Sequence, residues 1–142
     1  MERIVVGIDG SEESRKAVTL AARLAEALRA TLVVAHTMSY PGADDPTPVV
    51  SAEYSWWSTT HRTFAEALVR EAAAREARPG LTIETRVLTG DAALSLSRLA
   101  LEERAGLVVI GHRGRGLAER LLIGSVADRL VQLCERPVLV SR

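Results

Sequence analysis

The sequence predicts one doubly wound α/β domain, in which a parallel sheet carries helices on both faces. Short runs of β-branched and aliphatic residues alternate with longer segments whose apolar residues recur every three or four positions. Most of the short runs are almost continuously apolar, which is typical of parallel strands covered on both sides. The chain has 142 residues, 47% of them apolar and 25% charged, so we expect a single globular domain over 1–142.

The expected strands and helices alternate along the whole chain. The strands are expected at 4–8, 32–34, 81–88, 107–110 and 138–140. The helices are expected at 12–30, 58–78, 91–104 and 126–135. In the first helix, the apolar face is formed by Val18, Ala21, Ala22, Ala25 and Leu28. Because each strand is followed by a helix and then a parallel strand, the connections are expected to be right-handed crossovers.

The segment 39–57 interrupts this alternation. It carries three of the five prolines and both tryptophans, Trp56 and Trp57. We expect a long loop after the second strand, and loops of this length inside a domain are usually functional or partly disordered. Either the loop packs both tryptophans on the domain, or it acts as a lid or as a docking segment for a partner.

The overall charge argues against nucleic-acid and membrane partners. Eighteen basic and eighteen acidic side chains leave no net charge, so a site for an anion must be local. No apolar run is long enough to cross a bilayer. The lone Cys134 cannot form an internal disulfide, and the first residues do not resemble a signal peptide, so a cytoplasmic location is expected.

The junctions between strands and helices are the places to compare for a ligand site, because such sheets bind ligands beyond the carboxyl ends of their strands. The first junction holds Asp9, the expected helix cap Ser11 and two glutamates. The third has Asp91 as its expected cap. Both junctions supply their own carboxylates, which would repel a phosphate.

The fourth junction, 111–125, is rich in glycine and arginine and favours an anion. Its glycines let backbone N–H groups approach a ligand, and the following helix adds a positive N-terminus. Ser125 can cap this helix, with Asp128 at capping-box spacing, or turn its hydroxyl to a phosphate. The phosphate-loop motif of Walker nucleotidases and the dinucleotide motif are both absent.

The glycine spacing resembles the G-2x-G-9x-G-[S/T] signature of the ATP-binding universal stress proteins. Gly111 and Gly114 are separated by two residues, and nine residues then precede Gly124 and Ser125. The opening strand and helix, the fourth strand and the closing helix and strand also resemble that family. The resemblance implies a five-stranded parallel sheet in the order 3-2-1-4-5.

The same resemblance implies a role for individual residues. Gly111 would lie near the ribose, and Asp9 would contact the adenosine or help to hold Mg²⁺ or Mn²⁺ with the nucleotide. The phosphates would be held by Gly114, Gly124, Ser125 and the amide of Val126. The adenine would be bordered by Ile8, Ile110 and Thr37, where Thr37 replaces a more usual valine.

These features predict a stress-response regulator that binds ATP, ADP or AMP and has no dedicated catalytic residues. One alternative is a protein-interaction module that does not depend on nucleotide. Another is slow ATP hydrolysis or phosphotransfer through Ser125, His112 and Asp9. The last strand, from Val138 to Val140, is expected to be an edge that forms a homodimer.

Overall fold

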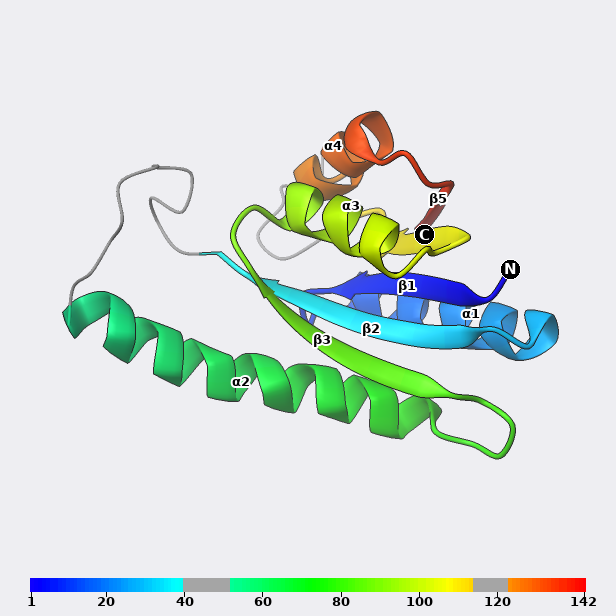
Figure 1. Ribbon diagram of the computed structural model, residues 1–142, viewed down its shortest axis with the longest axis horizontal. Coiled ribbons are helices and arrows are strands. Elements are labelled where there is room, and N and C mark those ends of the chain that lie inside the picture. The colour runs from blue at the N-terminus through cyan, green and yellow to red at the C-terminus, as the bar shows by residue number, and fades with distance from the viewer. Residues whose placement is uncertain (40–51, 114–122) are drawn as a thin grey trace.

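The structure is a computed structural model that describes residues 1–39, 52–113 and 123–142. The strands are β1 (Arg3–Ile8), β2 (Thr31–Met38), β3 (Ile83–Thr89), β4 (Leu107–Gly111) and β5 (Val138–Ser141). The helices are α1 (Glu12–Leu28), α2 (Ala52–Glu76), α3 (Ala92–Glu102) and α4 (Ser125–Leu133). Strands and helices therefore alternate as the sequence predicts (Figure 1).

The five strands form one parallel sheet in the order β3-β2-β1-β4-β5, which confirms the expected order. β1 lies at the centre, where Ile4 is level with Leu32 of β2 on one side and with Leu107 of β4 on the other. The chain adds β2 and β3 on one side of β1 and then β4 and β5 on the other. The strand order therefore reverses between β1 and β4.

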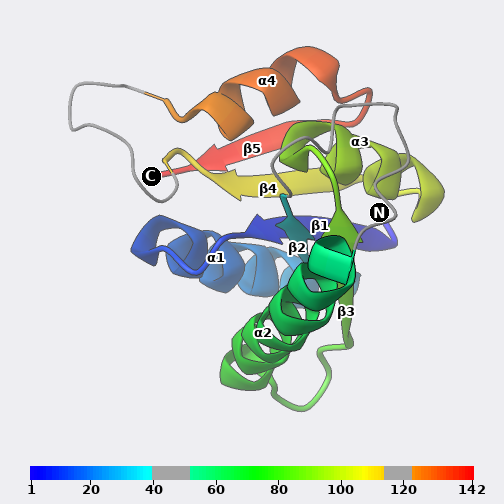
Figure 2. The same cartoon turned by 90° about the vertical axis from the view of Figure 1, so that its left-hand side faces the viewer.

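Helices cover both faces of the sheet (Figures 1 and 2). α1 and α2 pack on one face over a core that includes Ile4 and Val6. α3 and α4 pack on the other face, over Val5 and Val33. Because neighbouring residues of a strand point to opposite faces, a continuous apolar run supplies both cores. Within the described ranges, none of these helices combines the length and the apolar composition that a membrane span requires.

The helix α2 starts earlier than the sequence predicts. The expected loop over 39–57 is wrong at its end, because the helix begins at Ala52 and contains both tryptophans. Trp56 is 69% exposed and does not pack on the domain. Trp57 is partly buried and stacks on His61, with ring centroids 4.7 Å apart. This end of α2 extends past the sheet (Figure 1), so packing imposes no apolar periodicity on it. The rest of the expected loop, 40–51, lies outside the described residues.

The strand β2 is longer than its expected range. The apolar run predicts a strand over 32–34, whereas β2 continues to Met38. The additional residues include His36 and Thr37, which are polar and only partly buried. They interrupt the apolar run because the carboxyl end of β2 borders a pocket rather than the core. The part of β2 that the apolar run does not predict therefore includes residues that line the pocket.

Candidate functional site

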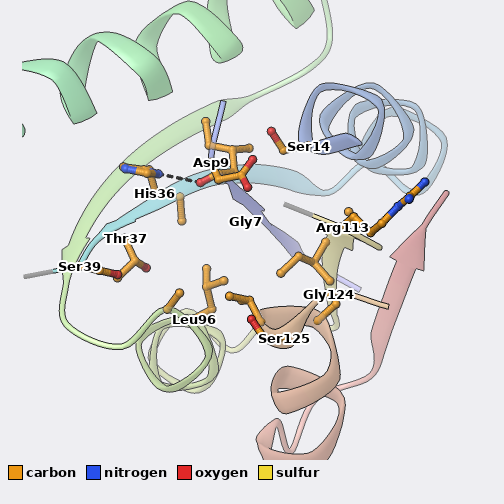
Figure 3. A pocket seen from close by; sticks show the side chains of 17 residues that line it. Gly7, Asp9, Ser14, His36, Thr37, Ser39, Leu96, Arg113, Gly124 and Ser125 are labelled. Atoms are coloured by element: carbon orange, nitrogen blue, oxygen red, sulfur yellow. Dashed lines mark hydrogen bonds between the residues drawn. The ribbon is translucent and has the colours of Figure 1, made fainter. Parts of the chain in front are cut away.

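A pocket of about 250 Å³ lies at the carboxyl ends of β1 and β4, where the strand order reverses (Figure 3). Open parallel sheets bind their ligands at this position. The predicted site residues that line the pocket are Ile8, Asp9, Thr37, Ile110, Gly111, Gly124, Ser125 and Val126. The other predicted residue, Gly114, lies outside the described residues. The fold thus brings the described candidates together around one cavity.

The N-terminus of α4 forms one wall of this pocket. Gly124 is the N-cap residue, with φ −72° and ψ 156°, and it provides no side-chain cap. Ser125 is the first helical residue, so the expectation that it can cap the helix is wrong. Gly124, Ser125 and Val126 all line the pocket. The unsatisfied N–H groups and the positive end of the helix dipole at this position favour an anion.

The N-terminus of α1 lies across the pocket and has the opposite character. Ser11 caps α1, and its hydroxyl accepts a hydrogen bond from the Ser14 amide at 3.2 Å. The Asp9 carboxylate accepts a bond from the Ser11 amide at 2.9 Å. Glu12 and Glu13 follow in the first turn. Carboxylates already compensate the positive end of the α1 dipole, so a phosphate is favoured at α4 rather than at α1.

The third junction likewise has its own carboxylate. Asp91 caps α3, accepting a bond from the Leu94 amide at 3.0 Å, and it also pairs with Arg129 of α4. Burial acts to raise the pKa of the Asp91 carboxyl. The bond from Leu94 and the guanidinium of Arg129 outweigh burial, and the pKa lies below its ordinary value. This contact also links α3 to α4 beside the pocket.

The described start of the glycine-rich segment is anchored to β5. The His112 amide donates to the Ser141 carbonyl at 2.8 Å, and the Gly124 amide donates to the His112 carbonyl. Arg113 donates through Nε to Nε2 of His112 at 3.0 Å, so His112 carries its proton on Nδ1 and donates to Ser141. Arg113 lines the pocket, whereas the His112 ring is directed to β5.

Aliphatic side chains also line the pocket, together with the polar His36, Thr37 and Ser39 at the end of β2. Ala35, Leu96 and Ile110 contribute aliphatic side chains. His36 lies on the rim and is held by a hydrogen bond of 2.7 Å between its Nδ1 and the Ile8 carbonyl. The pocket therefore combines the N-terminus of α4 with aliphatic side chains of β2, α3 and β4, which suits a ligand with an anionic group and a flat apolar body.

Gly111 has a packing role that its spacing in the sequence does not reveal. A Cβ atom at this position would lie 3.0 Å from the carbonyl carbon of Glu13 in α1. Because the neighbour is backbone and cannot easily move, only glycine allows this close approach. Gly7 has a similar role, since a Cβ there would lie 2.7 Å from Leu96 Cδ1. Both glycines let helices approach the ends of the central strands.

Sequence reasoning missed several residues of the pocket wall. These are Gly7, Ser14, Ala35, His36, Ser39, Ala92, Leu96 and Ala127. Most lie within helices or strands, where an alanine or leucine is indistinguishable from a core residue. Gly7 is the exception, because a glycine inside an apolar strand indicates a close approach by another part of the chain.

The whole chain, residues 1–142, matches the model of the universal stress protein family. The stress response protein NhaX of Bacillus subtilis is 30% identical over 162 residues, covering 99% of this chain and 98% of NhaX. A universal stress protein of Mycobacterium tuberculosis H37Rv is 34% identical over 145 residues, covering 98% of this chain. The matched region is 44% of that relative, so this chain spans less than half its length.

Solved structures of the same family share the fold. UspA from Lactobacillus plantarum has a TM-score of 0.85 at 21% identity, covering 99% of this chain and 97% of its own. A universal stress protein in complex with cAMP has a TM-score of 0.67 at 26% identity, covering 99% and 96%. One from Archaeoglobus fulgidus in complex with dAMP has a TM-score of 0.62 at 21% identity, covering 100% and 98%.

Proposed function

The chain belongs to the universal stress protein family, and on that premise we propose that it is a cytoplasmic stress-response regulator that binds an adenine nucleotide. The observation that carries the proposal is the pocket at the reversal of strand order, which combines a helix N-terminus without a side-chain cap with aliphatic side chains. Two structural relatives hold cAMP and dAMP, which are both adenine nucleotides.

In the proposed complex the phosphates lie at α4. The N–H groups of Ser125 and Val126 and the Ser125 hydroxyl donate to phosphate oxygens, and Gly124 leaves room for them. Arg113 also lines the pocket, with its Nε bonded to the His112 ring, and its side chain would have to turn to bring its charge to the phosphates. Gly114 would complete the phosphate cradle by its place in the signature. ATP, ADP and AMP all present the same first phosphate to this end.

The nucleoside occupies the rest of the pocket. The ribose lies against Gly111 and near Asp9, and the base lies between Ile8, Ile110 and the end of β2. This direction places the phosphates at the N–H groups of α4, whereas the opposite one would place them at the end of β2, away from the positive end of that helix.

Asp9 is the residue that would share a divalent cation with the phosphates. Mg²⁺ is commonly held by one or two carboxylates together with phosphate oxygens and water, so a single carboxylate beside the phosphate site fits this need. In residues 1–39, 52–113 and 123–142, no three His, Cys, Asp or Glu side chains gather to hold a metal by themselves. Mg²⁺ or Mn²⁺ would therefore bind with the nucleotide rather than before it.

Equilibrium dialysis with labelled ATP and AMP tests the proposal. We expect saturable binding at micromolar concentrations with one nucleotide per chain. Gly124→Leu should abolish binding without unfolding the protein, because the backbone at Gly124 suits any residue while a leucine side chain would occupy the phosphate site. Arg98→Leu, which places the same side chain on the exposed face of α3, should bind normally. Folded wild-type protein that binds neither nucleotide would refute the proposal.

We also propose that the protein forms a homodimer through β5. β5 is the last strand in the order and pairs only with β4 among the described strands. The Pro137 carbonyl accepts a bond from Val108 of β4 and the Ser141 carbonyl accepts one from His112, which follows β4, so the N–H groups of Val138 and Val140 point to the free edge. An unpaired edge with apolar side chains favours pairing with a second copy.

Proline at Val140 tests the dimer. It removes a donor from the free edge and leaves the bonds to β4 in place, so analytical ultracentrifugation should show monomers that retain nucleotide binding. Threonine at the same position keeps the N–H group and serves as the control. An unchanged sedimentation profile for Val140→Pro would exclude this interface.

A further inference from the structure

The Thr37 hydroxyl is the unusual group in the pocket wall. Within the described residues, its oxygen is buried and has no hydrogen-bond partner. Thr37 lies close to the end of β2 and lines the pocket next to Ser39 (Figure 3). A buried hydroxyl that makes no hydrogen bond is destabilising, so a structural role does not explain a threonine here.

Other buried polar atoms of this kind lie elsewhere. In the described part of the chain, the Nε atoms of Arg3 and Arg136 are also buried without a hydrogen bond. Arg3 Nε lies 2.8 Å from the Glu103 carboxylate, whose charge compensates it. Neither arginine lines the pocket. Thr37 thus combines an unsatisfied hydroxyl with a position in the wall of a cavity.

The surroundings of Thr37 indicate which part of a ligand it would meet. Ala35 of β2, Leu96 of α3 and Ile110 of β4 line the same pocket as Thr37. Aliphatic side chains together with the polar groups at the end of β2 suit a flat heterocycle, whose faces are apolar and whose edge carries donors and acceptors. The phosphate end has other partners at Ser125 and Arg113.

We propose that the Thr37 hydroxyl hydrogen-bonds a polar edge atom of the bound base and so contributes to base recognition. The inference rests on the proposed nucleotide function and adds a specificity-determining residue to it. Rotation about χ1 moves the threonine hydroxyl from one staggered position to another, so the hydroxyl can turn from the wall to the ligand. Bound nucleotide would then satisfy a group that the free protein leaves unpaired.

Thr37→Val provides the test, because valine replaces the hydroxyl with a methyl group of similar size. We expect AMP to bind about 5- to 10-fold more weakly by isothermal titration calorimetry, which is the loss of one hydrogen bond. Thr37→Ser retains the hydroxyl and should bind close to wild type. Thr85→Val makes the same change on β3, outside the pocket, and should leave AMP binding unchanged.

Two further measurements separate recognition of the base from a structural effect. Without ligand, Thr37→Val should melt about 2–4 °C higher than wild type, because it removes an unsatisfied buried hydroxyl. Ribose 5-phosphate, which has no base, should bind to both proteins with the same dissociation constant. The stability and the affinity for AMP would then change in opposite directions, which a purely structural hydroxyl would not produce.

The possible failures are distinguishable. If wild type binds AMP and Thr37→Val binds it equally well, the role of the hydroxyl is refuted and the proposed function stands. A lower melting temperature for unliganded Thr37→Val, or an equal loss of ribose 5-phosphate binding, would also refute the role in base recognition. If folded wild type binds no AMP, both proposals fail.

Discussion

The two Gly-Ser pairs of the chain precede helices but should respond differently to the same substitution. In Gly10-Ser11, the serine caps α1 through a hydrogen bond of 3.2 Å from the Ser14 amide. In Gly124-Ser125, the glycine is the cap and the serine is already helical. Replacing each serine with alanine therefore separates a stabilising role from a ligand-binding role in one pair of variants.

The magnitudes follow from these contacts. Ser11→Ala loses an N-cap and should lower the free energy of unfolding by about 1 kcal/mol, or the melting temperature by about 3 °C. Ser125→Ala removes no cap bond, so the free energy of unfolding should change by less than about 0.5 kcal/mol without ligand. A hydrogen bond to a charged phosphate contributes about 1.5–3 kcal/mol, so its loss should weaken AMP binding roughly 10- to 100-fold.

Thermal unfolding followed by circular dichroism measures the first effect, and isothermal titration calorimetry with AMP measures the second. Ser11→Ala should be less stable and bind AMP normally, whereas Ser125→Ala should be as stable as wild type and bind poorly. Equal loss of stability in the two unliganded variants would show that Ser125 is a cap after all. Unchanged AMP binding by Ser125→Ala would show that its hydroxyl does not contact the phosphate.

Three further predictions concern stability. The pKa of Asp91 is lowered from its ordinary value of 3.8, so the charge of Asp91 stabilises the fold above pH 3.8. In thermal melts, wild type should be more stable than Asp91→Asn above that pH, and this advantage should disappear as the pH falls below it. A difference that does not change with pH would contradict this. Leu130 is fully buried, so Leu130→Ala should lower the free energy of unfolding in urea by about 2–5 kcal/mol. Leu133 is 43% exposed, so Leu133→Ala should change this free energy little. Equal losses in the two variants would contradict the packing. Gly111→Ala should lose about 1–3 kcal/mol by crowding Glu13, and unchanged stability would show that α1 moves freely.

The sequence predicts the fold well where regular packing imposes a repeating apolar pattern on the residues. The order of strands and helices follows from the apolar runs and the helical periodicity, and the strand order follows from the family resemblance. Prediction fails at the start of α2, because the segment around Trp56 has no partner surface to impose a pattern. It also fails at the end of β2, where His36 and Thr37 face a pocket and break the apolar run.

The candidate site is predicted in part for a related reason. The glycine spacing and a helix start without an acidic cap predict Gly111, Gly124 and Ser125, because the backbone geometry at such positions favours particular residue types. Aliphatic residues of the pocket wall such as Leu96 cannot be predicted in this way, because the same residue type also fills the core. The sequence does not show that Gly124 rather than Ser125 is the N-cap of α4, since both residue types are good N-caps.

An NMR titration of the labelled wild-type protein with AMP shows whether the nucleotide binds in this pocket. We expect saturating shifts of the amide signals of Gly111, Ser125 and Val126, together with shifts at Thr37, because these residues line the pocket. The amide of Glu84, on β3 away from the pocket, should not shift. Absence of shifts in the folded protein, or saturating shifts that leave the pocket residues unaffected, would contradict the claim that this pocket binds an adenine nucleotide.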